Sequence, residues 1–592
     1  MSAAPPAPAP APRRQVWDNS NINESYPGIT LPLTYSFIQR AYRAVYWQFC
    51  QVLGLSEREI RGHQDMLGNM LGCLNGRVYY NLLNWYRLVA LLPGFRFNKG
   101  FMEAMMGLRQ PADLAGPPPA GWAAKYGREL PRLVRTGLRA VWLQWTLERR
   151  IRNFHREFDA AHRKFAALDY EGMPPAEALG HYGAMEREIL WRWKAPIIND
   201  FSAMVFYGAL KKLTVAWGVD PDGGLQNALV SRQGAIESTA VADELHGIAA
   251  LIARDVELRG RFLAAPPAEA VALLRAPGAV GDAFAQYLER YGDRCIAELK
   301  LESRSARDDP SFCVAVLQNY LRGSSVGAVS PARTEGLTPE AAREELRRRL
   351  RGHPFRHWAY RWVLSRAARA IRNRENQRLA RTRAFAVVRR IFRSVGAALA
   401  RDGRIAAGED VFYLRVEELE AAVGDGGRAL DLRALVGRRR GIYERFRALP
   451  PLPDHLETPG LVGGEELVEV PGSAPAAAAT GVLKGLGACP GVLTRRAVVL
   501  LEPDTSVRLN GEILVTRQTD PGWVVLFPSI SGLVVERGSM LSHSAIVARE
   551  MGIPAAVGVP GAVSRIRTGD LLRLDGAKGT VEILEAGEGA RQ

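Results

Sequence analysis

From residue 33 to about residue 450, apolar side chains recur at three- and four-residue spacing, which is the period of an amphipathic helix. The segments at 36–54, 135–168 and 242–258 show this pattern clearly. Prolines and glycines interrupt it at 111–119, at 221–224 and at 266–267. The pattern predicts a large all-helical body.

After residue 484 the pattern shortens to brief β-rich runs, separated by glycines, prolines and the turn sequence DGAKG. The runs read RRAVVLL, EILVTR, GLVVE, AAVGV, LLRLD and TVEIL. One helix stands among them, HSAIVAREM at 543–551, and Gly552 and Pro554 end it as helix stop signals do. These features predict a compact α/β domain of about a hundred residues.

Between these regions, residues 450–483 are rich in proline, alanine and glycine, which favour turns and extended chain. The predicted fold class is therefore multidomain, with a large all-α body followed by a small α/β domain. The predicted segments are a Pro/Ala-rich lead-in at 1–16, a helical domain at 17–449, a linker at 450–483, the α/β domain at 484–586 and a tail at 587–592.

Composition agrees with a folded, multidomain protein. The chain has 592 residues, of which 47% are hydrophobic and 24% charged, and this excludes a wholly disordered or fibrous protein. The longest apolar run, at 81–95, contains Arg87, and the N-terminus lacks the apolar core of a signal peptide, so we expect a cytoplasmic protein without a membrane span. The five cysteines lie far apart, which argues against a disulfide framework and a zinc site.

The net charge of +16 is compatible with nucleic acid or a phosphorylated ligand as a partner. Much of the excess lies between 341 and 404, where apolar residues recur at helical spacing among the arginines. A solvated basic face on long helices explains this charge without any ligand. Binding to nucleic acid therefore remains a minor alternative.

The single helix of the α/β region begins at a histidine. His543 follows Gly538, Ser539 and Ser542, and a helix N-terminus with free N–H groups favours a bound or covalently attached phosphate. A neutral imidazole has a lone pair that can attack phosphorus. The serine hydroxyls could donate hydrogen bonds to the phosphoryl oxygens, and Arg549 could add positive charge. The alternative is that His543 is a cap or a surface residue.

The stretch GSMLSHSAIVAREMGIPAAVG at 538–558 resembles the signature of the swivelling phosphohistidine domain of the phosphoenolpyruvate-utilising dikinases. The resemblance implies that His543 becomes phosphorylated, and Leu541 makes the loop similar to the rifampicin phosphotransferase branch of that family. A second stretch, VTRQTDPGW, is similar to a loop that approaches the histidine in this domain, which implies a role for Thr519 or Asp520. The same residues would form a turn in any protein.

Three stretches of the body resemble the substrate-side domain of the same family, at 17–37, 291–310 and 374–419. They supply the candidate substrate-binding residues Asn19, Asn21, Glu24, Arg294, Glu298 and Glu302. Loop and cap hydrogen bonds explain the first three equally well, and an ion-pair ladder at four-residue spacing explains the others.

The resemblance implies a phosphotransferase that relays a phosphoryl group through His543 to a small-molecule acceptor. We recognise neither an ATP-grasp domain before Trp17 nor a Gly-rich phosphate loop, so we expect the donor to be Mg-ATP on a separate ATP-grasp protein, or phosphoenolpyruvate. No metal site is predicted in the chain. The alternative is a non-catalytic ligand-binding protein in which the C-terminal domain serves as a lid.

Overall fold

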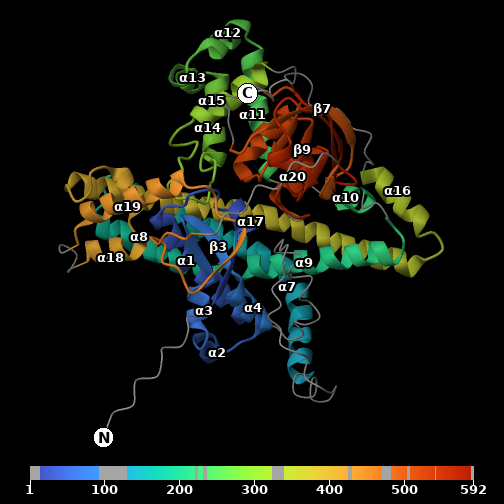
Figure 1. Ribbon diagram of the computed structural model, residues 1–592, viewed down its shortest axis with the longest axis horizontal. Helices are drawn as coiled ribbons and strands as arrows, with labels where there is room; N and C mark the ends of the chain where they lie inside the picture. Colours follow the sequence, from blue (N-terminus) through green and yellow to red (C-terminus); the bar gives the residue numbers. More distant parts are fainter. Residues whose placement is uncertain are drawn as a thin grey trace.

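The structure is a computed structural model that describes residues 14–91, 130–220, 224–230, 237–322, 339–424, 430–469, 482–502, 507, 509–540 and 542–587. Leu541 and most of the predicted lead-in and tail lie outside the described residues. Helix α17 (Pro354–Arg401) runs through the body beside α9 (Lys194–Ala216) (Figure 1). These two antiparallel neighbours form the spine on which the rest of the molecule is assembled.

The sequence of α17 explains its length. It starts with a proline at the first turn, where the missing N–H costs nothing, and contains no proline afterwards. Buried alanines such as Ala380 and Ala384 let neighbouring helices approach closely. At Gly396 a β-carbon would lie 2.3 Å from the carbonyl oxygen of Gly408, so only glycine permits this packing.

The other body helices pack around this spine in one large hydrophobic core. Phe37, Phe385 and Tyr182 meet in it at edge-on ring contacts. The helices of this part are α1 (Pro32–Leu53), α2 (Glu57–Arg61), α3 (Gln64–Gly68), α4 (Leu82–Ala90), α7 (Leu130–Ala166), α8 (Pro175–Glu188), α18 (Val416–Val423), α19 (Leu432–Ala448) and the 3-10 helices η1 (Ile22–Glu24), η2 (Leu190–Arg192) and η3 (Gly408–Tyr413).

The body also carries a four-stranded antiparallel sheet in the order β2-β3-β1-β4, which the sequence analysis did not predict. Its strands are β1 (Gln15–Asp18), β2 (Leu71–Leu74), β3 (Arg77–Asn81) and β4 (His455–Thr458). Strand β1 begins inside the predicted lead-in and β4 inside the predicted linker. Trp17 donates a hydrogen bond of 2.8 Å to Thr458, and the ring fills the space left by Gly72.

The C-terminal domain is built on an eight-stranded sheet in the order β5-β12-β11-β7-β8-β9-β10-β6, with parallel pairing from β7 to β10. Helix α20 (His543–Met551) connects β9 and β10, as the sequence predicted, and α21 (Ala562–Arg565) follows. A helical body followed by an α/β domain confirms the predicted fold class. The strands are β5 (Leu483–Lys484), β6 (Leu486–Cys489), β7 (Val492–Val499), β8 (Ile513–Thr516), β9 (Gly532–Val535), β10 (Ala555–Val557), β11 (Leu571–Asp575) and β12 (Thr580–Glu585).

A group of body helices lies beside this α/β domain (Figure 1) and shares a buried hydrophobic cluster with it. Trp523 and Phe527 of the 3-10 helix η5 (Pro521–Ser529) belong to the same buried cluster as Leu245 and Tyr320. The Tyr320 hydroxyl donates a hydrogen bond to the carbonyl oxygen of Val525. The helices of the group are α11 (Glu237–Ala253), α12 (Val256–Ala264), α13 (Pro267–Arg275), α14 (Ala279–Tyr291) and α15 (Ser311–Arg322).

Polar contacts tie the α/β domain to the remainder of the body. Asn23 and Gln518 exchange two hydrogen bonds, of 2.6 and 2.7 Å, and Arg537 forms an ion pair with Asp454. Near the far end of the spine, α10 (Gly224–Val230) and α16 (Pro339–Arg349) pack against each other. In this arrangement the domain is docked on the body.

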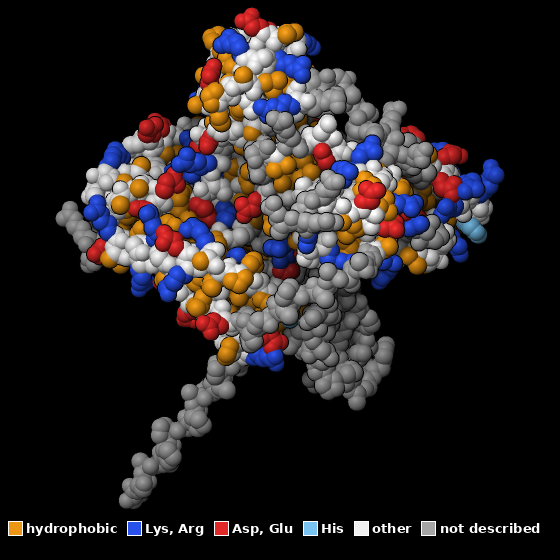
Figure 2. Space-filling view, turned by 45° about the horizontal axis from the view of Figure 1, so that its top comes forward, with side chains coloured by type: hydrophobic (Ala, Val, Ile, Leu, Met, Phe, Trp, Pro, Cys, Tyr) orange, Lys and Arg blue, Asp and Glu red, His pale blue; other side chains and the backbone are white. Residues whose placement is uncertain are grey.

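Positive charge is distributed over the surface together with negative charge. On the described part of the face shown in Figure 2, Lys and Arg side chains are interspersed with Asp and Glu. In α16, Arg347 pairs with Glu344, while Arg348 and Arg349 pair with Glu345. Among the described residues, no helix has the length and apolar character required to cross a membrane.

Removing the indole of Trp523 tests how much the contact between η5 and the helical group stabilises the C-terminal domain. Trp523 is 2% exposed, and we expect Trp523→Ala to lower the free energy of unfolding of this domain by about 3–5 kcal/mol. Denaturant titration measures the change. The matched control is Trp145→Ala, because Trp145 is 85% exposed and its loss should cost at most about 0.5 kcal/mol. Equal effects of the two substitutions would contradict the assigned contact.

Candidate functional site

The loop before α20 places His543 at the first position of that helix. Gly538 has φ +132°, a conformation that an L side chain rarely adopts. Ser542 caps the helix, and its hydroxyl accepts a hydrogen bond of 3.4 Å from the backbone N–H of Ala545. Gly552 ends the helix in the left-handed conformation. The sequence thus fixes the helix at both ends and leaves His543 completely buried.

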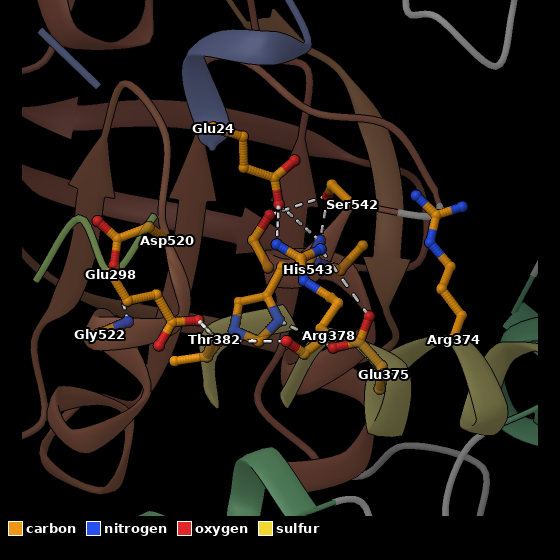
Figure 3. Close-up of polar contacts among 12 residues, drawn as sticks. Glu24, Glu298, Arg374, Glu375, Arg378, Thr382, Asp520, Gly522, Ser542 and His543 are labelled. Carbon is orange, nitrogen blue, oxygen red and sulfur yellow. Dashed lines mark hydrogen bonds and ion pairs between the residues drawn. The ribbon is translucent and has the colours of Figure 1, made fainter. Parts of the chain in front are cut away.

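The two ring nitrogens of His543 have different surroundings. Nδ1 lies 3.0 Å from Oε2 of Glu375 on α17, while Nε2 is buried without a hydrogen-bond partner among the described residues (Figure 3). An ionised carboxylate only accepts hydrogen bonds, so the contact assigns the proton to Nδ1. In the neutral ring with this tautomer, the lone pair is on Nε2.

The Glu375 carboxylate is charged in this position. Its burial alone would raise its pKa, but Arg378 and the contact with His543 outweigh that effect and lower the pKa to about 2. Arg378 lies 3.9 Å from Glu375 and 3.6 Å from Glu24, and both distances exceed those of good hydrogen bonds. Its Nε has no hydrogen-bond partner among the described residues. The guanidinium therefore has donors left for an anion.

Glu24 of η1 contacts the histidine from another direction. Its Oε1 accepts a hydrogen bond of 3.0 Å from the backbone N–H of His543. This N–H is one of the helix donors without an intrahelical partner. Figure 3 shows Glu24, Arg378 and Ser542 gathered near His543.

Two further carboxyl groups, those of Glu298 and Asp520, lie in the same interface. Glu298 accepts a hydrogen bond of 2.7 Å from Thr382 on α17 and lies 3.1 Å from Arg294. Asp520 of the α/β domain accepts hydrogen bonds from the backbone N–H groups of Gly522, at 2.7 Å, and of Ala297, at 3.2 Å.

The environment of Asp520 favours its protonated form. Burial raises its pKa to about 7, and the nearby Glu298 carboxylate adds to this effect. The backbone N–H groups of Gly522 and Ala297, together with Arg378, oppose the shift without cancelling it. Docking of the α/β domain thus creates a carboxyl group that titrates near neutral pH.

A cavity of about 310 Å³ opens beside this cluster. Glu24 and Arg378 line it on the side of the histidine, together with Ser542. Much of the rest of its wall is aromatic or basic, with aliphatic residues and Asp200 among them; the residues used below are Tyr26, Tyr42, Tyr46, Tyr80, Trp193, Arg374, Gln377 and Arg381. Its size suits a small organic molecule.

The structure brings several of the predicted site residues together. His543, Ser542, Glu24, Glu298 and Asp520 all lie in the interface between the body and the α/β domain. Further predicted residues border it: Ser539 and Asn21 line the cavity, Gly538 shapes the loop, and Arg294 pairs with Glu298.

Other predicted residues have different surroundings. The Arg549 side chain donates hydrogen bonds to the carbonyl oxygens of Ala488 and Met540, which anchors the loop. Glu302 accepts hydrogen bonds from Thr34 and from the backbone of Leu31. Asn19 and Thr519 are buried, and neither lines the cavity; Asn19 Oδ1 and Thr519 Oγ1 lack hydrogen-bond partners among the described residues.

Three residues of α17 at the site were not predicted: Glu375, Arg378 and Thr382. Their spacing of three and four residues places them on one face of the helix. A polar stripe of this kind inside a helix with many buried positions is the sequence feature that could have identified these residues. Within the described residues, no group of three or more His, Cys, Asp or Glu side chains is arranged to hold a metal ion.

Two protein families match the two parts of this interface. Residues 508–579 match the family "PEP-utilising enzyme, mobile domain", and this range includes the histidine loop. Residues 196–375 match "Rifampicin phosphotransferase fourth domain" and include most of α9 and the first part of α17. These matches confirm the resemblance to the phosphoenolpyruvate-utilising dikinases.

Individual proteins show the same relationship. Rifampicin phosphotransferase from a Streptomyces species is 36% identical over 309 residues, and the one from Bacillus subtilis is 33% identical over 311 residues. Each alignment covers 51% of this chain and 34% of the relative, so the matched part spans about a third of those proteins. The prodigiosin synthesizing transferase PigC from Serratia marcescens is 27% identical over 98% of this chain and 64% of its own length.

The titration of Asp520 makes a prediction about stability. In the unfolded chain a carboxyl of this type loses its proton near its ordinary pKa of 3.8, whereas the folded chain keeps it up to about 7. The folded state therefore binds more protons in this window, and the free energy of unfolding falls as the pH rises through it. Asp520→Asn should remove this component of the pH dependence.

Denaturant titrations at pH 5 and pH 8 measure this effect. We expect wild type to lose stability relative to Asp520→Asn between these two values, and the exposed control Asp402→Asn to follow wild type. Parallel behaviour of wild type and Asp520→Asn would show that Asp520 does not take up a proton on folding.

Proposed function

We propose that this protein is a phosphotransferase component in which His543 carries a phosphoryl group to a small-molecule acceptor. The observation that carries the proposal is the difference between the two ring nitrogens of His543. Nδ1 faces the Glu375 carboxylate, and Nε2 has no hydrogen-bond partner among the described residues. The families matched by the two parts of the interface support it.

Nε2 is the nucleophile in this proposal. Its lone pair attacks the phosphorus of the donor, and the P–O bond to the leaving group breaks. The donor is Mg-ATP on an ATP-grasp protein, or phosphoenolpyruvate, with magnesium held mostly by the donor and its own site. Because His543 is completely buried in the docked arrangement, charging requires the α/β domain to leave the body.

Glu375 assists the second step, the transfer of the phosphoryl group from His543 to the acceptor. A phosphoryl group on Nε2 with a proton on Nδ1 makes the ring cationic, and the carboxylate stabilises that charge. When the P–N bond breaks, its electron pair stays on Nε2, and the ring leaves as neutral imidazole instead of imidazolate. Without the proton on Nδ1 the leaving group would be an anion and departure would be slow.

The acceptor occupies the cavity beside Glu24 and Arg378. Its hydroxyl oxygen attacks the phosphorus, and the proton passes to the Glu24 carboxylate, which lines the cavity and already contacts the histidine backbone. Arg378 supplies the positive charge for the transferring phosphoryl oxygens. The relatives named rifampicin phosphotransferase support a small-molecule acceptor.

Replacing the histidine tests the carrier directly. Wild type incubated with Mg-ATP and an ATP-grasp protein, or with phosphoenolpyruvate, should gain one acid-labile phosphoryl group by intact-mass analysis, and His543→Ala should gain none. His353→Ala is the matched control, because His353 is exposed at the start of α17. Retained phosphorylation of His543→Ala would refute the carrier role. If wild type is not charged either, with an active partner present, the ligand-binding alternative with the α/β domain as a lid is favoured.

The role of Glu375 is tested by the lifetime of the phosphohistidine. We expect Glu375→Gln to slow the release of inorganic phosphate from the charged protein by about 10- to 100-fold, the value of a hydrogen bond between charged groups. Phosphate release is followed after removal of the donor. Glu409→Gln, at an exposed ion pair with Arg393, should behave as wild type. An unchanged lifetime in Glu375→Gln would exclude the carboxylate from the transfer step.

A further inference from the structure

The wall of the tyrosine-lined cavity contains information about the acceptor. Tyr42 stands at the centre of a cluster, with ring centroids 6.4 Å from Tyr26, 6.0 Å from Tyr46 and 6.2 Å from Tyr80. All four residues line the cavity, and Trp193 extends the same wall. Aromatic faces at such spacing favour a planar, apolar ring as their neighbour.

The charges in the wall do not cancel. Arg378 has Glu24 at 3.6 Å, and Arg374 has Asp200 at 3.8 Å. Arg381 also lines the cavity, but among the described residues it has no carboxylate within ion-pair distance, and its Nε lacks a hydrogen-bond partner. One positive charge is therefore left over, and it favours an anion in the cavity.

Gln377 is the second unsatisfied group. It is 4% exposed, it lines the cavity, and neither its Oε1 nor its Nε2 has a hydrogen-bond partner among the described residues. Leaving both ends of a buried amide unpaired is unfavourable, because each group loses its hydrogen bonds to water. A ligand carboxylate supplies an acceptor for the Nε2 donor of this amide.

We propose that the acceptor is an aromatic hydroxy acid, with its ring against the tyrosines and its carboxylate bound by Arg381 and Gln377. This inference rests on the proposed function, because it takes the phosphoryl group to be delivered by His543. Arg381 lies three residues after Arg378, which is about one helical turn, or about 4.5 Å along the axis. The carboxylate is thereby held apart from the phosphoryl group, and the hydroxyl is left as the reacting atom.

Transfer to this acceptor balances without any further reactant. The hydroxyl oxygen forms the O–P bond, the P–Nε2 bond breaks, and the hydroxyl proton passes to Glu24. The product is an aryl phosphate ester that retains its carboxylate. Arg381 and Gln377 contact only the non-reacting end of the acceptor, so they determine binding and specificity.

Binding to the uncharged full-length protein tests the inference by calorimetry. The probes are 3-hydroxybenzoate and 3-hydroxybenzamide, which share ring and hydroxyl and differ in charge. We expect the acid to bind about tenfold or more tightly than the amide. Equal affinities for the two probes, or no binding of the acid, would overturn the proposal.

Variants of α17 locate the charge that is responsible. Arg381→Met should weaken binding of the acid to the level of the amide and leave the amide unchanged, which also shows that the cavity is intact. Arg361→Met is the matched control, since Arg361 is an exposed residue of the same helix. Should Arg381→Met fail to fold, Arg381→Gln removes the same charge while keeping hydrogen-bonding groups, and provides a second test with the same expectation. Equal weakening of both probes would contradict the assigned contact.

The two proposals fail separately. His543→Ala cannot be charged but should still bind 3-hydroxybenzoate, because the tyrosines, Arg381 and Gln377 that are assigned to bind it belong to the body. A charged wild type that neither binds nor phosphorylates the acid would refute the acceptor class and leave the carrier role standing. If wild type binds the acid but cannot be charged, the carrier role is refuted and the assignment of the binding site stands.

Discussion

The contact between His543 and Glu375 is the interaction on which the site depends, because it joins two parts of the chain that are separated by 168 positions. Both side chains are buried, and a charged carboxylate is costly to bury unless it is paired. Arg378 provides part of that pairing from the same helix, and the His543 ring provides the rest only when the α/β domain is docked. The same contact that holds the domain in place therefore also sets the proton on Nδ1 and leaves Nε2 free.

Helix α17 serves both sides of the site. Its face toward the histidine carries Glu375 and Thr382, and its face toward the cavity carries Arg374, Gln377 and Arg381. A continuous helix of 48 residues keeps these groups at fixed spacing. The relative positions of the carrier and the acceptor thus follow from one rigid element packed along α9.

How far the sequence predicts this structure depends on whether a signal is local. Helix α20 was predicted to the residue, because the cap at Ser542 and the stop at Gly552 lie within ten positions of each other. The small sheet of the body was missed because its strands have four or five residues and pair β1 with β4 across more than 430 positions. Such pairings leave no periodicity in any one segment.

The same distinction applies to the site. The histidine loop carries its own signal, in the glycine, the cap and the helix N-terminus. The partners on α17 carry no local signal of this kind. An arginine-rich helix with one glutamate has the pattern of a solvated basic face, and the sequence does not show that another domain covers it. Glu24 was recognisable only as a polar residue in a loop, and its contact with the His543 backbone depends on how the two domains meet.

The balance of charge at the interface bears on the direction of transfer. Glu24, Glu298 and Glu375 face Arg294 and Arg378 there, whereas Arg374 and Arg381 line the cavity. A phosphoryl group on Nε2 would add further negative charge to a site shielded from water, where repulsion is strong. Delivery of that group to an acceptor in the cavity would relieve the repulsion while keeping the domain docked. The carboxylates that make docking of the charged carrier costly would therefore favour completion of the transfer.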